Sequence, residues 1–433
     1  MVATASILDL WPDLVDDKTG IVRAVKELFI DDDEPAFVHY LSYACDTSAF
    51  GFLPNFGNNG GGGTTARSAI AKALGEAVER YCSALFRYED LEWAAYGELD
   101  LPATHPETFA LYSAGQYAVP GFSWQRFTVD TRVAWVRGTS LVSGAPVLVP
   151  AAFTFVPYHF QRERGDTPIT QPISTGLACG GSFADAARSA LCEVIERDAF
   201  TRTWQAVQQR PRIEESTLPA QLLDLIDRYA AVDLAVHLLD ITSDVGAPTI
   251  LSVAEGFAAT SPAIAVAAAT HPDPVVAVRK SLEELAHTRK YAAQVMDYLP
   301  PVPVDLAGGH PQVDGQRAHL RFYCPQEAKS AASFLWSSEL RIHLDEVARP
   351  ADDELSALVA AVAATGQEVV AVELTSPDIA DLGLHVVRVI VPGFHPLQMG
   401  HSNRCLGGDR LAADLWVAGR GPDDDNPYPH PFP

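Results

Sequence analysis

The chain lacks the common sequence patterns of transition-metal sites. Its six cysteines are scattered without a C-x-x-C pair, and its thirteen histidines form no H-x-x-x-H or H-E-x-x-H motif. This spacing excludes the common zinc motifs and is typical of a protein in a reducing compartment. No glycine-rich segment is followed by G-K-[ST], which disfavours a P-loop ATPase.

Long apolar runs and positive charges are also scarce. No run reaches the roughly 18 residues that cross a bilayer, and no basic region precedes a long apolar stretch at the N-terminus, so neither a membrane anchor nor a signal peptide is expected. Lys and Arg total 31 against 55 Asp and Glu, a net charge of -24, which argues against a nucleic-acid partner. We therefore expect a cytoplasmic protein, and 433 residues allow one elaborate domain or two or three smaller ones.

One pattern occurs twice, as G-E-A-V-E-R at residues 75–80 and as C-E-V-I-E-R at residues 192–197. Residues three apart on a helix lie on the same face, so the motif offers two carboxylate pairs: Glu76 with Glu79, and Glu193 with Glu196. Such a motif is common on solvated helix faces, but both copies lie in apolar windows, where paired carboxylates are costly to bury without a cation. Two such helices could hold Mg²⁺ against a nucleoside triphosphate, with Arg80 and Arg197 near the phosphates.

Both helices follow glycine-rich segments, at residues 58–65 and 174–181. Glycine lets backbone N–H groups approach an anion closely, and a helix N-terminus adds partial positive charge. These segments could therefore serve a nucleotide, or they could be plain flexible turns. A third helix, capped by Asp273, carries Glu284 and Arg289.

Two further features flank or follow these helices. Cys179 and Cys192 lie near the glutamates, so a nucleophilic thiol is conceivable, although a buried structural role is favoured. The chain ends on P-Y-P-H-P-F-P at residues 427–433. Because proline fixes φ and lacks an N–H, this tail is expected to be extended and able to enter a cleft. A disordered end or an SH3-type ligand is the alternative.

Hydrophobic periodicity indicates an α/β protein. Helices are predicted near residues 15–29, 65–86, 183–207, 274–294 and 352–365. Strands are predicted at 36–43, 133–149 with a turn near Ser143-Gly144, 234–239, 249–254, 263–268, 368–374 and 384–391. Short strands with helices on either side suggest mixed layers. A proline-rich segment at 298–303 and a polar stretch near 308–317 mark a loop or a joint between subdomains.

The ordered set of motifs resembles the YcaO family. The set consists of G-E-x-x-E-R-Y, S-T-G-L-A-C-G, C-E-V-I-E-R-D-A-F, L-E-E-L-A-H-T-R, V-P-G-F-H-P-L and N-P-x-P-H-P-F-P. It is similar to the D component of azoline-forming cyclodehydratases of streptolysin- and microcin-type bacteriocin pathways, and the P-x-P-x-P end marks that branch. The resemblance runs from about residue 35 to the last residue. It implies a YcaO-type α/β architecture with helices packed on β-sheets.

The resemblance also assigns residues. It implies that Mg²⁺ is bound by Glu76, Glu79, Glu193 and Glu196. It implies that ATP is bound by these four together with Arg289, while Arg80 and Arg197 are the arginines expected near the phosphates. Lys72 and Asp185 stand where many members carry Ser and Glu; Lys72 could contact phosphate, and Asp185 keeps a carboxylate. Pro429, Pro431 and Pro433 are expected to take part in catalysis. Gly181 and Ser189 stand where many members carry polar side chains, which keeps a non-catalytic member as an alternative.

The implied activity is ATP-dependent cyclodehydration of Cys, Ser or Thr in a ribosomally synthesised precursor peptide. The product is a thiazoline or oxazoline, formed through phosphorylation of the backbone amide oxygen. Implied partners are the precursor, an E1-like protein that binds its leader, and a flavin dehydrogenase; a homodimer is compatible with these.

Because fused cyclodehydratases often carry a zinc site in their leader-binding portion, the absence of cysteine pairs favours a free-standing D protein. Two alternatives remain. One is thioamide or amidine formation, which the P-x-P-x-P end disfavours, and the other is a docking scaffold of the same complex. We expect a helical extension at 1–34, an ATP-binding catalytic domain at 35–420 and a proline-rich tail at 421–433.

Overall fold

The structure, a computed structural model, describes residues 6–304, 310, 312–350, 352–421 and 424–432. The chain separates into two compact units. Unit 1 takes in residues 1–28, 38–194 and 354–394, and unit 2 takes in residues 29–37, 195–353 and 395–433. These divisions do not coincide with the predicted boundaries after residues 34 and 420. Helix α4 (Phe183–Gln205) begins in unit 1 and ends in unit 2.

Unit 1 contains two antiparallel sheets. The first has the order β1-β2-β3, and the second has the order β4-β5-β13-β14-β7 with β6 paired to β5. The strands are β1 (Val22–Leu28), β2 (Val38–Ala44), β3 (Asn58–Gly63), β4 (Glu92–Ala94), β5 (Val133–Ser140), β6 (Pro146–Pro150), β7 (Leu177–Gly180), β13 (Val370–Glu373) and β14 (His385–Ile390). Besides the first part of α4, the helices are α1 (Trp11–Leu14), α2 (Ala66–Ala84), α3 (Ala114–Tyr117), α9 (Leu355–Ala364) and α10 (Pro377–Asp381).

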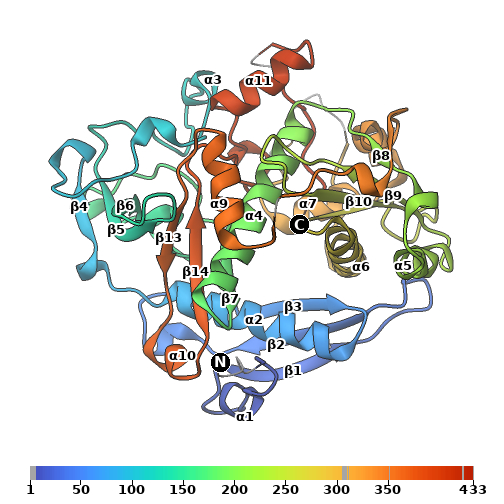
Figure 1. Ribbon diagram of the computed structural model, residues 1–433, viewed down its shortest axis with the longest axis horizontal. Helices are drawn as coiled ribbons and strands as arrows, with labels where there is room; N and C mark the ends of the chain where they lie inside the picture. The colour runs from blue at the N-terminus through green and yellow to red at the C-terminus, as the bar shows by residue number, and fades with distance from the viewer. Residues whose placement is uncertain (1–5, 305–309, 311, 351, 422–423, 433) are drawn as a thin grey trace. The chain divides into compact units, whose positions relative to one another are not determined.

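Helix α2 lies directly on the glycine strand β3, as Figure 1 shows. A Cβ atom on Gly61 would lie 2.0 Å from the Ala69 carbonyl oxygen, and one on Gly63 would lie 2.3 Å from the Ser68 hydroxyl. The helix starts after Thr65, whose side chain accepts a hydrogen bond from the Ser68 N–H, as an N-cap does. Glycine is therefore required here because the helix backbone approaches closely.

Two sequence predictions in unit 1 are wrong, because strands form where loops or a helix were expected. The glycine-rich segments at 58–65 and 174–181 were expected to be loops, but β3 occupies most of the first and β7 half of the second. The helix predicted near residues 15–29 is instead a turn followed by β1. Pairing of β1 with β2, in which Ala24 lies opposite Tyr43, outweighs the helical spacing of its apolar residues.

Unit 2 contains a sheet in the order β11-β10-β9-β8-β12, antiparallel except for the parallel pair β8 and β12. Its strands are β8 (Arg212–Ile213), β9 (Ala235–Asp240), β10 (Thr249–Glu255), β11 (Ile264–Thr270) and β12 (Arg341–Ile342). Its helices, besides the second part of α4, are α5 (Ala220–Ala230), α6 (Pro274–Tyr298), α7 (Gln316–Phe322), α8 (Lys329–Ala332) and α11 (Asp409–Val417). Short 3₁₀ turns join many elements.

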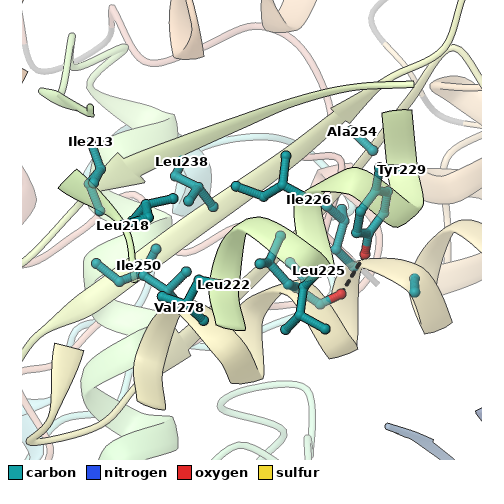
Figure 2. Packing of buried hydrophobic residues seen from close by; sticks show 14 of the residues in the cluster. Ile213, Leu218, Leu222, Leu225, Ile226, Tyr229, Leu238, Ile250, Ala254 and Val278 are labelled. Atoms are coloured by element: carbon teal, nitrogen blue, oxygen red, sulfur yellow. Dashed lines mark hydrogen bonds between the residues drawn. The ribbon is translucent and has the colours of Figure 1, made fainter. Parts of the chain in front are cut away.

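One hydrophobic cluster of unit 2 lies between this sheet and helices α5 and α6 (Figure 2), and a second one includes Phe200, Trp204 and Phe432. Asp273 caps α6 and Pro274 occupies its first turn, which directs Val278 and Leu282 onto β10. Tyr229 of α5 joins the two helices, because its hydroxyl donates to the Leu282 carbonyl oxygen at 2.5 Å. Each buried leucine side chain contributes about 1.5–3 kcal/mol to folding, so this cluster fixes the positions of α5 and α6.

The remaining predictions of secondary structure are confirmed. The helices near 65–86, 183–207, 274–294 and 352–365 are α2, α4, α6 and α9. The strands predicted from residue 36 onward correspond to β2, β5 with β6, β9, β10, β11, β13 and β14. Part of the polar stretch near 308–317 lies outside the described residues. Within the described part of the chain, no helix combines the length and the apolar character needed to span a bilayer.

Candidate nucleotide and metal site

Three of the four predicted metal-binding carboxylates lie in unit 1, and each is held by the backbone. Helix α2 carries Glu76 and Glu79, and the first part of α4 carries Glu193. Each accepts one hydrogen bond from a backbone N–H in or next to a glycine-bearing strand: Glu76 from Gly60 at 2.8 Å, Glu79 from Cys179 at 2.9 Å and Glu193 from Gly176 at 2.9 Å. The two segments predicted to be loops therefore fix the glutamates.

The surroundings of the Glu79 carboxyl disfavour its ionised form. The residue keeps partial exposure, but desolvation of its carboxyl raises its pKa to about 8, against the lowering effect of Arg80. The Glu76 and Glu193 carboxylates raise the pKa further. Desolvation and like charges both disfavour the ionised form, so a cation near Glu79 would relieve both.

Two arginines of unit 1 have unsatisfied donors near these acids. Arg80 lies 3.4 Å from Glu76, and its Nη1 is buried without a hydrogen-bond partner among the described residues. Arg388 of β14 is 3% exposed, and its Nε and Nη1 also find no acceptor in the described chain. Carboxylate oxygens suit Mg²⁺, and guanidinium groups suit phosphate. The residues present therefore fit a magnesium–nucleotide complex.

Asn59 of β3 is a further polar group of this unit that has no partner in the described part of the chain. It is 2% exposed, and neither its side-chain oxygen nor its nitrogen is hydrogen-bonded there. Side chains alternate along a strand, so Asn59 shares the face of Gly61 and Gly63, which lies against α2. It is the residue before Gly60, whose N–H holds Glu76.

Glu196 and Arg197 lie in unit 2, one turn beyond Glu193 on α4. Glu196 accepts a hydrogen bond from the Thr270 N–H at 3.2 Å, and its other oxygen is 3.7 Å from the Arg197 Nε. The Arg197 guanidinium lies over the Phe432 ring, 4.3 Å from its centroid. The second E-x-x-E-R copy is thus linked to the C-terminal tail.

The tail is packed into unit 2. Asn426, Pro429, His430, Pro431 and Phe432 are buried. Four of its residues are hydrogen-bonded through the backbone: Asn426 to Gln205 at 2.9 Å, Tyr428 to Trp204 at 3.2 Å, Pro429 to Tyr323 at 2.6 Å and His430 to His319 at 2.8 Å. In its described part the tail forms neither a helix nor a strand. Pro433 lies outside the described residues.

Arg289, Lys72 and Asp185 lie in different surroundings. Arg289 of α6 in unit 2 is 2% exposed, and burial lowers its pKa against the opposing effect of Asp33 and Glu34. Lys72 donates to the Gly62 carbonyl oxygen at 2.7 Å. Asp185 is exposed in the first turn of α4, where it accepts from Ser182 and lies 3.5 Å from Arg188.

The cysteine near the glutamates is not activated. Burial, followed by the Glu79 carboxylate, raises the pKa of the Cys179 thiol far above its ordinary value. A nucleophilic cysteine requires a lowered pKa, so Cys179 fits the structural role that was favoured. Among the described residues, no group of three or more His, Cys, Asp or Glu side chains gathers closely enough to hold a metal by itself. Mg²⁺ commonly completes its shell with water and substrate phosphates.

Sequence reasoning missed Arg388, Asn59 and a buried charge network around Asp198. Asp198 accepts from Arg410 at 2.8 Å, Arg202 at 3.2 Å and the His395 N–H at 3.0 Å. Burial opposes its ionisation, but His395, Arg410 and Arg202 together lower its pKa. For Arg388 a signal existed, because a lone arginine within the apolar run V-V-R-V-I is costly to bury without a role.

The comparisons with known proteins identify the family of the chain. A sequence model of the family described as YcaO cyclodehydratase, ATP- and Mg²⁺-binding, matches residues 60–395. The chain therefore belongs to the YcaO family, as its motifs predict. An uncharacterised protein of Methanothermobacter thermautotrophicus is 30% identical over 346 residues, which cover 77% of this chain and 80% of the relative.

Solved structures confirm the mixed α/β fold. A heterocyclase in complex with substrate and cofactor superposes with a TM-score of 0.76 at 22% identity, covering 98% of this chain and 56% of its own. The heterocyclase TruD gives a TM-score of 0.63 at 25% identity, covering 84% of this chain and 50% of its own. The chain thus spans about half the length of these two heterocyclases.

The family also defines the cofactors. The YcaO protein of Methanopyrus kandleri, bound with AMPPCP and Mg²⁺, has a TM-score of 0.62 at 22% identity and covers 86% of both chains. The description of the family names the same pair, ATP and Mg²⁺. ATP and Mg²⁺ are therefore the cofactors of this protein.

Proposed function

We propose that this protein catalyses ATP-dependent cyclodehydration of Cys, Ser or Thr residues in a ribosomally synthesised precursor peptide. Membership of a family described as cyclodehydratase supports the reaction class. The proposal rests chiefly on three glutamates of unit 1, each anchored by a backbone N–H, and on the unpaired donors of Arg80 and Arg388 in the same unit. Together with water and phosphate ligands, these carboxylates could bind a divalent cation, and the donors could bind phosphate.

The proposed chemistry begins with attack of the side-chain sulfur or oxygen, which gives up its proton, on the preceding amide carbon, whose C=O bond becomes a C–O⁻ bond. The amide oxygen then takes the γ-phosphoryl group of ATP, which releases ADP. Loss of the amide proton and of phosphate forms the C=N bond of a thiazoline or oxazoline. When bound, Mg²⁺ would neutralise negative charge on the phosphate groups of ATP.

The proposed roles are those that the sequence motifs suggest. Glu76, Glu79, Glu193 and Glu196 hold the cation. Arg80, Arg197, Arg289 and Lys72 face the nucleotide, and Asp185 contributes a further carboxylate. Burial of these groups away from water would strengthen their interactions with the nucleotide. The bound substrate would place its amide oxygen in line with the γ-phosphoryl group of ATP.

The tail is proposed to serve the reaction centre. Phe432 stacks under Arg197, which neighbours Glu196. A tail held by backbone hydrogen bonds places its last residues at a defined point with little loss of entropy, because proline limits their freedom beforehand. Pro429, Pro431 and Pro433 would then hold a backbone or terminal carboxylate group that accepts a proton during cyclisation.

The proposed setting is cytoplasmic, without membrane or nucleic-acid partners. An E1-like protein would bind the leader of the precursor, and a flavin dehydrogenase would oxidise the azoline to an azole. A homodimer is compatible with these assignments. Localisation of the tagged protein by cell fractionation and co-purification of the leader-binding protein would check them.

The decisive experiment incubates the protein with Mg²⁺·ATP, the leader-binding partner and the precursor, and measures peptide mass and phosphate release. Loss of one water per ring, with phosphate release that depends on the precursor, is expected. Exchange of oxygen for sulfur would instead indicate thioamide formation. An unchanged peptide mass without ATP consumption would indicate a docking scaffold and refute the proposal.

A further inference from the structure

Arg388 lies on the face of its sheet that is turned toward α2. Val386, two residues earlier on β14, packs in a cluster with Val78 and Cys82 of α2. Side chains two apart on a strand point to the same face, so Arg388 shares the face of Val386. The charged groups that act on it are Glu193 and Arg80, which belong to the candidate site.

Pairing within the sheet places Arg388 beside the segment that holds Glu193. Arg388 lies opposite Leu177 of β7, and the next residue, Val389, donates to the Gly176 carbonyl oxygen at 2.7 Å. The Gly176 N–H in turn holds Glu193. A Cβ atom on Gly176 would lie 2.6 Å from Val194 and 2.3 Å from the Val389 carbonyl oxygen, so strand and helix are in close contact here.

The guanidinium of Arg388 is buried with two of its hydrogen-bond donors unpaired in the described chain. Burial lowers the pKa of Arg388 to about 10, which leaves it a cation at neutral pH. Within the described chain its Nε and Nη1 have no acceptor, and the positive charge of Arg80 acts on it unfavourably. A buried donor without a partner has lost its hydrogen bonds to water and gained none in return. An acceptor with negative charge would make up this loss.

We propose that Arg388 binds phosphate oxygens of Mg²⁺·ATP through its Nε and Nη1, which makes it a nucleotide-binding residue outside the E-x-x-E-R motifs. This inference rests on the proposed function. The two donors point in different directions from the planar, permanently charged guanidinium, so each can donate to a separate phosphate oxygen. The three carboxylates of the candidate site suit the Mg²⁺ ion, and the unpaired guanidinium donors suit the phosphate groups of ATP.

The test measures binding of Mg²⁺·AMPPCP by calorimetry to the full chain and to three variants. Arg388→Gln should weaken binding about ten- to a hundred-fold, as expected for loss of a charge-assisted hydrogen bond. Arg388→Lys should recover part of the loss, because it keeps the charge but not the several fixed donors of the guanidinium. Arg137→Gln is the matched control, because Arg137 is an exposed arginine of β5 in the same sheet, and it should bind as the wild type does.

Thermal unfolding of the ligand-free variants separates binding from a structural role. Since those two donors make no hydrogen bond in the described chain, Arg388→Gln should leave the ligand-free Tm nearly unchanged and reduce only the rise in Tm caused by Mg²⁺·AMPPCP. Unchanged affinity, or a large fall in the ligand-free Tm for both Arg388 variants, would overturn the assignment. Failure of the wild type to bind Mg²⁺·AMPPCP would refute the proposed function as well.

Discussion

The guanidinium of Arg197 stacks on the ring of Phe432, with 4.3 Å between the guanidinium carbon and the ring centroid. The contact joins the second E-x-x-E-R motif to the end of the chain within unit 2. Phe432 also lies 4.7 Å from the ring of Phe200, so the tail is part of the hydrophobic core as well as a neighbour of a predicted phosphate-binding residue.

Removing this ring should destabilise unit 2. Phe432 is 1% exposed, and Phe432→Ala leaves a cavity that costs about 3–5 kcal/mol. Urea unfolding followed by tryptophan fluorescence would measure the loss. Phe29→Ala is the control, because Phe29 belongs to the same unit and is 90% exposed. Equal stability of the two variants would show that the tail is not docked in solution.

The carboxylates should be needed for catalysis rather than for folding. Glu79→Gln, Glu193→Gln and Glu196→Gln should each abolish ring formation, because a neutral amide binds Mg²⁺ far less well than a carboxylate. Circular dichroism should show the same fold in all three variants. Glu107→Gln, at an exposed glutamate, is the control. Normal turnover by all three site variants would contradict the metal assignment.

Glu79 should make the stability of the ligand-free protein depend on pH. Its pKa is about 8 in the folded chain against an ordinary value of 4.5, so the folded state binds more protons between these values. Folding stability should therefore decrease as pH rises from about 4.5 to about 8, by on the order of a few kcal/mol. Denaturant unfolding across this range would measure the decrease.

The control for this dependence is Glu79→Gln, which cannot ionise and should show a shallower decrease. Addition of Mg²⁺·AMPPCP at neutral pH should also release protons, since cation binding needs the ionised carboxylate. Calorimetry in buffers of different ionisation enthalpy detects such release. An identical pH dependence in the wild type and the variant would show that Glu79 titrates in its ordinary range.

Catalysis should depend on a second protein. The isolated chain is expected to process the precursor very poorly, and the leader-binding partner should raise the rate by orders of magnitude. Competition kinetics with a leaderless precursor provide the comparison, because that peptide should gain little from the partner. Efficient, leader-dependent turnover by the chain alone would place leader recognition within it.

Local sequence predicted those features that depend on local spacing. The capped helices α2 and α6 and the pairs Glu76 with Glu79 and Glu193 with Glu196 follow from helical periodicity. The glycines of β3 were predicted to form a loop, because glycine is common in flexible turns. Glycine is present there because it permits the close contact of Gly61 with α2. Long-range contacts, such as those of Arg197 with Phe432 and of Glu79 with the Cys179 N–H, have no local pattern.

The anchoring of the three glutamates in unit 1 has a consequence for how the family can vary. The groups that anchor them are main-chain amides, and every residue except proline supplies one. At position 179, the side chain can therefore be replaced, and the backbone N–H still donates to the Glu79 carboxylate. At position 176, where φ is +82° and a Cβ would clash, glycine is required for shape alone. Distant relatives can thus lose side-chain identity around the site while the main chain preserves its geometry.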